Sequence, residues 1–131
     1  MSNTITPLLM FEGQAEEAMR LYTRIFADSQ IEQIERYQPG EPGIEGTVKH
    51  AALRIGKQML ECIDSAVEHP FAFTPAISLS VECERDEEID DLFAQLSDEG
   101  TILMGLDTYP FARRFGWLTD RFGVSWQLRL A

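Results

Sequence analysis

The sequence has few cysteines, few basic residues and no long apolar run. Its 131 residues include two cysteines, Cys62 and Cys83, each inside an apolar segment. Two isolated cysteines make neither a disulfide framework nor a zinc site, so we expect reduced thiols in the core. No apolar run approaches the roughly 18 residues that cross a membrane, and Met1–Thr4 is too short and too polar for a secretory leader. These absences predict a cytoplasmic protein with no membrane partner.

Basic residues are scarce compared with acidic ones. The chain has 11 lysines and arginines against 22 aspartates and glutamates, which gives a formal net charge of −11. This charge repels phosphate backbones and anionic lipid, so we expect no nucleic-acid partner. The acidic residues gather in Glu82–Asp91, where they are typical of the solvated side of a helix.

Several motifs of catalysis and cofactor binding are missing from the sequence. It contains no G-x-S-x-G, no P-loop and no H-E-x-x-H, so nucleophilic and zinc-hydrolase chemistry has no anchor. A nucleotide-type methyl-donor site needs a glycine-rich turn between a strand and a helix, and neither expected helix is preceded by one. We therefore expect no cofactor.

A repeated apolar pattern is what the sequence does contain. Two stretches, about seventy residues apart, have apolar residues at i, i+3, i+4 and i+7, which is the pattern of an amphipathic helix. They comprise Ala18, Leu21, Tyr22 and Ile25, and then Ile89, Leu92, Phe93 and Leu96. Each stretch follows a short apolar run and precedes a series of strand-like segments. This order predicts an α+β fold in which one βαβββ unit occurs twice, with curved mixed sheets around a concave cavity.

The repeat sets the expected boundaries. Module one covers about residues 5–65 and module two about residues 75–130, and both belong to one domain because either half alone has a small core. Helices are expected over Gln14–Phe26 and Asp86–Glu99, and Gly100 is expected to cap the second helix. Strands are expected over Ile5–Phe11, Ile31–Tyr37, Thr47–Ile55, Gln58–Ile63, Ala76–Cys83, Thr101–Met104, Phe115–Thr119 and Val124–Leu130.

Alternation within the strands predicts which side of each sheet a helix covers. In the last strand Trp126 and Leu128 point to one side, and Gln127 and Arg129 point to the other. The apolar side should pack against a helix. The polar side would then curve around a small molecule. Asp64–Thr74 has little periodicity and is expected to link the modules.

Several segments resemble those of a known superfamily. They are Ile5–Phe11, the helix from Ala15 to Phe26, and Asp120–Leu128. With the repeated βαβββ order, they resemble the vicinal oxygen chelate superfamily of glyoxalase I, bleomycin-resistance proteins and extradiol dioxygenases over nearly the whole chain. His69–Ser78 and Tyr109–Leu118 are similar to the PhnB-like branch, which is often labelled 3-demethylubiquinone-9 3-methyltransferase.

The resemblance implies a metal position at which this sequence lacks ligands. Enzymes of the superfamily hold a divalent metal with four side chains, usually His and Glu, from the first and fourth strands of each module. By resemblance these positions fall at Pro7, Glu61, Ala76 or Ser78, and Gln127. Only Glu61 is a good ligand, so the resemblance implies a member without the usual metal. It also implies a homodimer, because cavities in this superfamily are commonly completed between modules of one or two subunits.

Six residues are expected to bind the ligand. They are Phe11, His50, Glu61, Ser78, Gln127 and Arg129. A carboxylate inside an apolar strand needs a partner, so Glu61 should meet Arg129, Gln127 or water, and it is the candidate catalytic base. His50 is either a proton carrier or a hydrogen-bonded strand residue.

Two functions lead among those that the sequence leaves open, and a third class is a partner-binding module, which would keep an exposed aromatic patch in the dimer. The first is a small-molecule binding protein of bleomycin-resistance type. The second is an enzyme of the same superfamily: a lyase, an isomerase or the methyltransferase of the label, with Glu61 as base or with an unorthodox set of metal ligands that includes His50.

Overall fold

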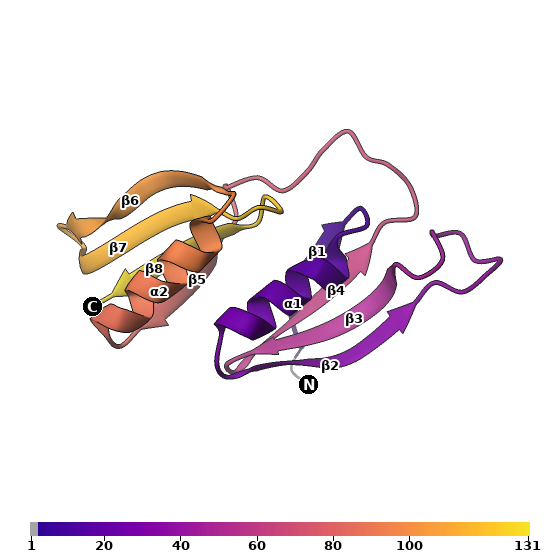
Figure 1. The fold of residues 1–131 in the computed structure, drawn as a ribbon, viewed down its shortest axis with the longest axis horizontal. Helices are drawn as coiled ribbons and strands as arrows, with labels where there is room; N and C mark the ends of the chain where they lie inside the picture. The colour runs from indigo at the N-terminus through magenta and orange to yellow at the C-terminus, as the bar shows by residue number, and fades with distance from the viewer. Residues whose placement is uncertain (1–2) are drawn as a thin grey trace. The chain divides into compact units, whose positions relative to one another are not determined.

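The computed structural model describes residues 3–131, so Met1 and Ser2, part of the segment examined as a leader, lie outside the described residues. Helices and strands follow in the order β1 α1 β2 β3 β4 β5 α2 β6 β7 β8 (Figure 1). The chain divides into two compact units, the first ending at His69 and the second beginning at Pro70, inside the predicted linker. Within the described residues, no helix is long and apolar enough to cross a membrane.

The first unit is a four-stranded mixed sheet with one helix. Its elements are β1 (Leu8–Phe11), α1 (Ala15–Ile25), β2 (Ser29–Arg36), β3 (Val48–Ile55) and β4 (Gln58–Asp64). The strands lie in the order β1-β4-β3-β2, with β1 parallel to β4 and the other neighbours antiparallel. The turn at Gly56-Lys57 joins β3 to β4 and places Ile55 opposite Gln58, as predicted.

The second unit repeats this arrangement. Its elements are β5 (Leu79–Cys83), α2 (Asp86–Ser97), β6 (Thr101–Tyr109), β7 (Ala112–Thr119) and β8 (Ser125–Leu130). The strands lie in the order β5-β8-β7-β6, with β5 parallel to β8 and the other neighbours antiparallel. Both units therefore have the same connectivity, and the predicted duplicated α+β fold is confirmed.

Each helix packs on one face of its own sheet and leaves the other face without a helix from that unit (Figure 1). All eight apolar residues of the two predicted stripes are buried. On the sheet of the second unit, Trp126 and Leu128 are buried as predicted. Packing is close at Gly116 of β7, where a Cβ would lie 2.4 Å from Cε2 of Phe93. We call the second face of each sheet, the one that its own helix does not cover, the open face.

The predicted end of the strand from Thr101 is wrong. The prediction stops it at Met104, but β6 continues to Tyr109 and forms a long hairpin with β7. Its residues Gly105 and Asp107 have weak strand preference. Pairing with β7 overrides that preference, and the register shifts of this hairpin accommodate them.

The first strand of each unit begins later than predicted. Ile5–Pro7 and Ala76–Ser78 lie before β1 and β5. Pro7 has no N–H to donate to a strand ladder. Its carbonyl still accepts a hydrogen bond from the Glu61 N–H at 2.9 Å, so the chain follows β4 before the regular strand begins.

The predicted cap of the second helix is wrong by one residue. Helix α2 ends at Ser97, and Glu99 is the residue that adopts a left-handed conformation, with φ of 61°. Gly100 is needed for a different reason, because a Cβ at this position would lie 2.2 Å from the carbonyl oxygen of Thr119. The helix end therefore contains a strained glutamate beside a glycine that allows close backbone approach.

Candidate ligand-binding site

Two predicted site residues lie together on the open face of the first unit. Nε2 of His50 on β3 is 2.8 Å from Oε1 of Glu61 on β4. Both side chains are partly exposed, at 39% and 37%. The register sets Ala52 opposite Glu61, which makes His50 its diagonal neighbour on the same face. His50 is thus a hydrogen-bonded strand residue, and it is the partner of Glu61 within this unit.

The pair has a defined hydrogen-bond direction. An ionised carboxylate can only accept, so His50 donates through Nε2–H and Glu61 accepts. The other ring nitrogen, Nδ1, then carries the lone pair. Met59 and Ile63 flank Glu61 on the same face and are partly buried, so the polar pair lies between apolar side chains. This arrangement can hold a polar group of a ligand or accept a proton from it.

A hydrogen-bonded cluster occupies the open face of the second unit. We call it the Ser78 cluster, and it contains Ser78, Trp117, Ser125 and Gln127. The indole Nε1–H of Trp117 donates to Ser125 Oγ at 2.9 Å, and the two serine hydroxyl oxygens are 2.7 Å apart. Gln127 Nε2 donates to Ser78 Oγ at 3.4 Å. Two predicted ligand residues, Ser78 and Gln127, are thereby brought together, whereas sequence reasoning missed Trp117 and Ser125 as members of this cluster.

Arg129 lies further along β8 than Gln127 and points to the same face. Its Nη2 donates to the Phe111 carbonyl oxygen at 2.9 Å. Phe111 also stacks on Tyr109, with ring centroids 5.6 Å apart, and meets Phe115 edge to face at 4.9 Å. A cation and an aromatic cluster therefore border the open face near the β6–β7 turn.

Phe11 is not part of either open face. Its side chain is 3% exposed and belongs to the core of the first unit. Leu8 is the residue of β1 that lies opposite Glu61, and Phe11, three positions later, points to the opposite side of the sheet. The structure therefore separates Phe11 from His50 and Glu61.

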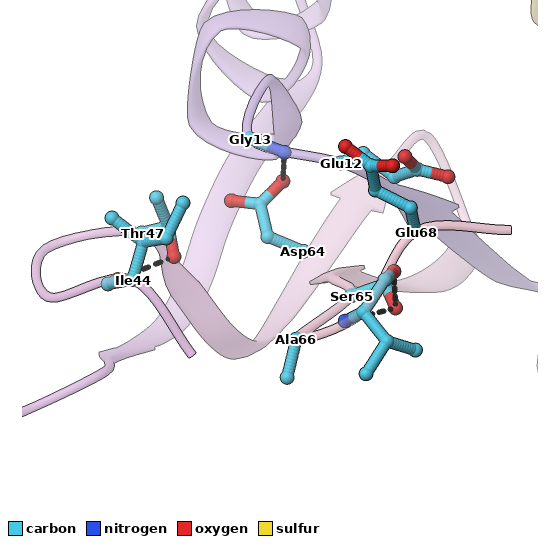
Figure 2. A pocket seen from close by; sticks show the side chains of 9 residues that line it. Glu12, Gly13, Ile44, Thr47, Asp64, Ser65, Ala66 and Glu68 are labelled. Atoms are coloured by element: carbon cyan, nitrogen blue, oxygen red, sulfur yellow. Dashed lines mark hydrogen bonds between the residues drawn. The ribbon is translucent and has the colours of Figure 1, made fainter. Parts of the chain in front are cut away.

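A small pocket of about 160 Å³ lies at the start of α1 in the first unit (Figure 2). It is lined by Glu12, Gly13, Ile44, Thr47, Asp64, Ser65, Ala66, Val67 and Glu68. In the sequence, Asp64 is the first residue of the predicted linker, and the sequence indicates no hydrogen-bond partner for its carboxylate. In the structure its two oxygens accept the N–H groups of Gly13, Ala15 and Val48 at 2.8–3.0 Å. Asp64 therefore has a structural role, and none of the six predicted ligand residues lines this pocket.

Both cysteines are poorly suited to nucleophilic chemistry. Burial raises the pKa of the Cys62 thiol from 9.0 to about 12, and the charge of Asp64 adds to the shift. Burial also raises the pKa of the Cys83 thiol to about 11, with a smaller contribution from Glu88. Since the thiolate is the reactive form, neither residue is a candidate nucleophile at neutral pH.

The donor sets of the two open faces do not fit the divalent metal that the resemblance in sequence implies. The first unit offers His50 and Glu61, which bond to each other. The Ser78 cluster offers neutral hydroxyl and amide groups, which are weaker ligands than imidazole or carboxylate. No group of three or more histidines, cysteines, aspartates or glutamates in residues 3–131 is arranged to hold a metal ion.

The duplicated βαβββ units and their strand order are those of the glyoxalase/bleomycin-resistance fold. A glyoxylase/bleomycin resistance protein/dioxygenase domain from Frankia sp. EAN1pec has this fold with a TM-score of 0.72. The match covers 100% of this chain and 93% of that chain at 16% sequence identity. The chain therefore has the fold that the sequence predicts.

The model of the 3-demethylubiquinone-9 3-methyltransferase family matches residues 3–129. The PhnB protein of Bacillus cereus, provisionally described as such a methyltransferase, is 56% identical; the match covers 98% of this chain and 100% of that chain with a TM-score of 0.95. Protein PA1353 of Pseudomonas aeruginosa is 28% identical, with 98% of both chains covered and a TM-score of 0.86. The chain belongs to the 3-demethylubiquinone-9 3-methyltransferase (PhnB-like) family. No curated protein sequence is significantly similar to it.

Proposed function

We propose that this chain binds a small molecule on an open sheet face, and that it does so without the divalent metal that the resemblance to the vicinal oxygen chelate superfamily implies. One observation carries the proposal: four of the predicted ligand residues form two hydrogen-bonded pairs on the open faces, His50 with Glu61 and Ser78 with Gln127. Fixed polar groups among apolar ones are the usual lining of a ligand site. The neighbouring aromatic rings favour a flat, partly apolar ligand.

A thermal-shift screen tests this function. Small aromatic acids, aromatic ketones and hydroxylated aromatics are added to the purified protein. A ligand at about 100 times its Kd stabilises the folded state by about 2.7 kcal/mol, which raises Tm by several degrees. Gln127→Ala should weaken the response, whereas Gln38→Ala, in the loop after β2, should leave it unchanged. Equal responses of the two variants would contradict the proposed site.

Metal independence has its own test. We expect elemental analysis of the purified protein to give far less than one equivalent of zinc, manganese, nickel or iron. One full equivalent of any of these metals, lost in Glu61→Ala, would contradict this part of the proposal.

Methyl transfer, the activity in the family's description, is not what this fold supports. In doubly wound α/β folds, nucleotide-type cofactors bind at a glycine-rich turn between a strand and a helix. Here β1 passes into α1 through Glu12-Gly13-Gln14, and both sheets are mixed. We expect no heat of binding when S-adenosylmethionine is titrated into the protein, and saturable binding would favour the family's description instead.

A second candidate function is proton abstraction by the His50–Glu61 pair. The 2.8 Å hydrogen bond favours it, because Glu61 orients the ring and leaves Nδ1 to accept a proton. Hydrogen exchange at the carbon next to the carbonyl of hydroxyacetone, followed by NMR in D₂O, reports such a base. Loss of exchange in both Glu61→Gln and His50→Gln would favour an isomerase or lyase. Exchange that neither variant changes would favour binding alone.

We also propose that two chains form a homodimer. Large apolar side chains are exposed at the starts of two of the edge strands, β1 and β5: Leu8 is 50% exposed, and Ile5 and Ile77, which precede these strands, are 88% and 75% exposed. Strands β1 and β5 each have one neighbour within their own sheet, and such an edge is where a sheet can pair with another strand. Covering such edges with a second chain is a common solution in β-proteins.

A further inference from the structure

The hydrogen bonds of Ser125 fix the direction in which its hydroxyl proton points. The indole N–H of Trp117 can only donate, so Ser125 Oγ accepts at 2.9 Å. Ser125 is 2% exposed, and a buried hydroxyl proton without an acceptor is costly. Among the described residues, the acceptor within reach of this proton is Ser78 Oγ at 2.7 Å. Ser125 therefore donates to Ser78.

This direction determines what Ser78 can offer to a ligand. Its oxygen accepts from Ser125 at 2.7 Å and from the Gln127 amide at 3.4 Å. A serine hydroxyl has two acceptor positions and one proton, so both acceptor positions are used. Within residues 3–131 the Ser78 hydroxyl bonds to Ser125 and Gln127, neither of which accepts its proton, and Ser78 is partly exposed on the open face. Its proton is thus the unused group of the Ser78 cluster.

We propose that Ser78 donates this hydrogen bond to an acceptor oxygen of the ligand, and that the ligand is an aromatic carbonyl or carboxylate compound. The proposal rests on the proposed function and adds the chemical class of the ligand. The ring of Trp117, held by its bond to Ser125, provides a flat apolar surface beside the donor. Arg129 on the same face adds positive charge, which also favours an oxygen acceptor over a donor group.

Two probes of nearly equal shape test the proposal. 2-Acetylnaphthalene has a carbonyl oxygen, and 2-isopropylnaphthalene replaces it with a methyl group. One hydrogen bond of ordinary strength corresponds to about a fivefold difference in Kd. We expect the wild-type protein to bind the ketone about fivefold more tightly than the hydrocarbon, measured by titration of tryptophan fluorescence.

Variants then test whether Ser78 causes the difference in Kd between the two probes. Ser78→Ala should bind both probes with equal affinity. Ser80→Ala is the matched control, because Ser80 lies in β5, two residues after Ser78, and its side chain has no hydrogen bond to the cluster, so this variant should keep the fivefold preference. Ser125→Ala should reduce the preference although Ser125 is too buried to touch a ligand, because it is a positioning residue for Ser78. Circular dichroism establishes that each variant is folded.

Three other outcomes would contradict the role of Ser78, and one of them would also contradict the proposed function. Equal affinity of the wild-type protein for both probes overturns the role of Ser78 and leaves the proposed function in place. A ketone preference that survives in Ser78→Ala does the same. Failure of both probes to bind at millimolar concentration contradicts the proposed function for flat apolar ligands, and the role of Ser78 with it.

Discussion

A single buried carboxylate holds together the end of one strand and the beginnings of two other elements. Asp64 accepts N–H groups from Gly13, Ala15 and Val48, and its side chain is almost fully buried, with the residue 2% exposed. We predict that Asp64→Ala lowers the free energy of unfolding by about 3 kcal/mol, because buried backbone donors lose their acceptor. Urea denaturation measures this change.

Two further variants serve as comparisons for Asp64→Ala. Asp64→Asn keeps one acceptor oxygen and should lose less stability than Asp64→Ala. Asp28→Ala removes an aspartate whose side chain is 79% exposed, and it should change stability by less than about 0.5 kcal/mol. If Asp64→Ala matched Asp28→Ala, the three hydrogen bonds would have no net stabilising effect.

The two thiols predict how stability changes with alkaline pH. Their pKa values are raised by burial to about 12 for Cys62 and about 11 for Cys83, from an ordinary value of 9.0. A raised pKa in the folded state gives stability that is complete below pH 9.0 and is lost as the pH rises toward 11–12. We expect the double variant Cys62→Ala, Cys83→Ala to lose less stability than the wild type over this pH range.

Reaction with a disulfide reagent checks the same property. Near pH 8 the folded protein should react slowly at both cysteines, and the protein in urea should react at once. Fast reaction of the folded protein would mean that the thiols are accessible.

At the scale of elements, the end of α2 contains a residue that the backbone conformation does not favour. Glu99 has φ of 61°, a region in which glycine is unstrained. We predict that Glu99→Gly raises the free energy of unfolding by about 0.5–1 kcal/mol, measured by thermal and urea denaturation. Glu87→Gly, in the first turn of the same helix, should lower it. A loss of stability in Glu99→Gly would show that the 3.4 Å ion pair with Arg121 outweighs the strain.

The helices and their buried sides follow from the sequence because their signal is local. Positions i, i+3, i+4 and i+7 lie on one side of a helix whatever it packs against. The β6–β7 hairpin could not be predicted in the same way, since Gly105 and Asp107 become strand residues only through pairing. Glu99 was missed because a glycine follows it, and the sequence does not tell which of two adjacent residues is left-handed.

The candidate site also has a part that the sequence could predict and a part that it could not. The two-residue turn at Gly56-Lys57 fixes the register of β3 and β4, so the proximity of His50 to Glu61 could have been found from the sequence. The Ser78 cluster could not, because Ser78 and Ser125 are 47 residues apart and meet through the parallel pairing of β5 with β8. The direction of the Phe11 side chain depends on how β1 pairs with β4, which is also a long-range contact. The sequence does not give this register, and Phe11 was therefore assigned to the site although it lies in the core.

At the scale of the whole molecule, the duplicated fold and the exposed strand edges lead to a prediction of assembly. Analytical ultracentrifugation should give about twice the chain mass of 14.9 kDa. Leu8→Lys and Ile77→Lys place charges at the apolar edges, and like charges brought together by a symmetric contact repel. Each should shift the protein toward monomer.

The control for this experiment is Ile44→Lys, because Ile44 is 77% exposed but lies in the β2–β3 loop, away from the strand edges. It should leave the mass unchanged. A monomer for the wild-type protein at tens of micromolar would contradict the homodimer. A dimer that persists in Leu8→Lys and Ile77→Lys but is lost in Ile44→Lys would move the contact to the loop. Because the Ser78 cluster lies within one chain, its ketone preference should survive in any monomeric variant, which separates assembly from ligand binding.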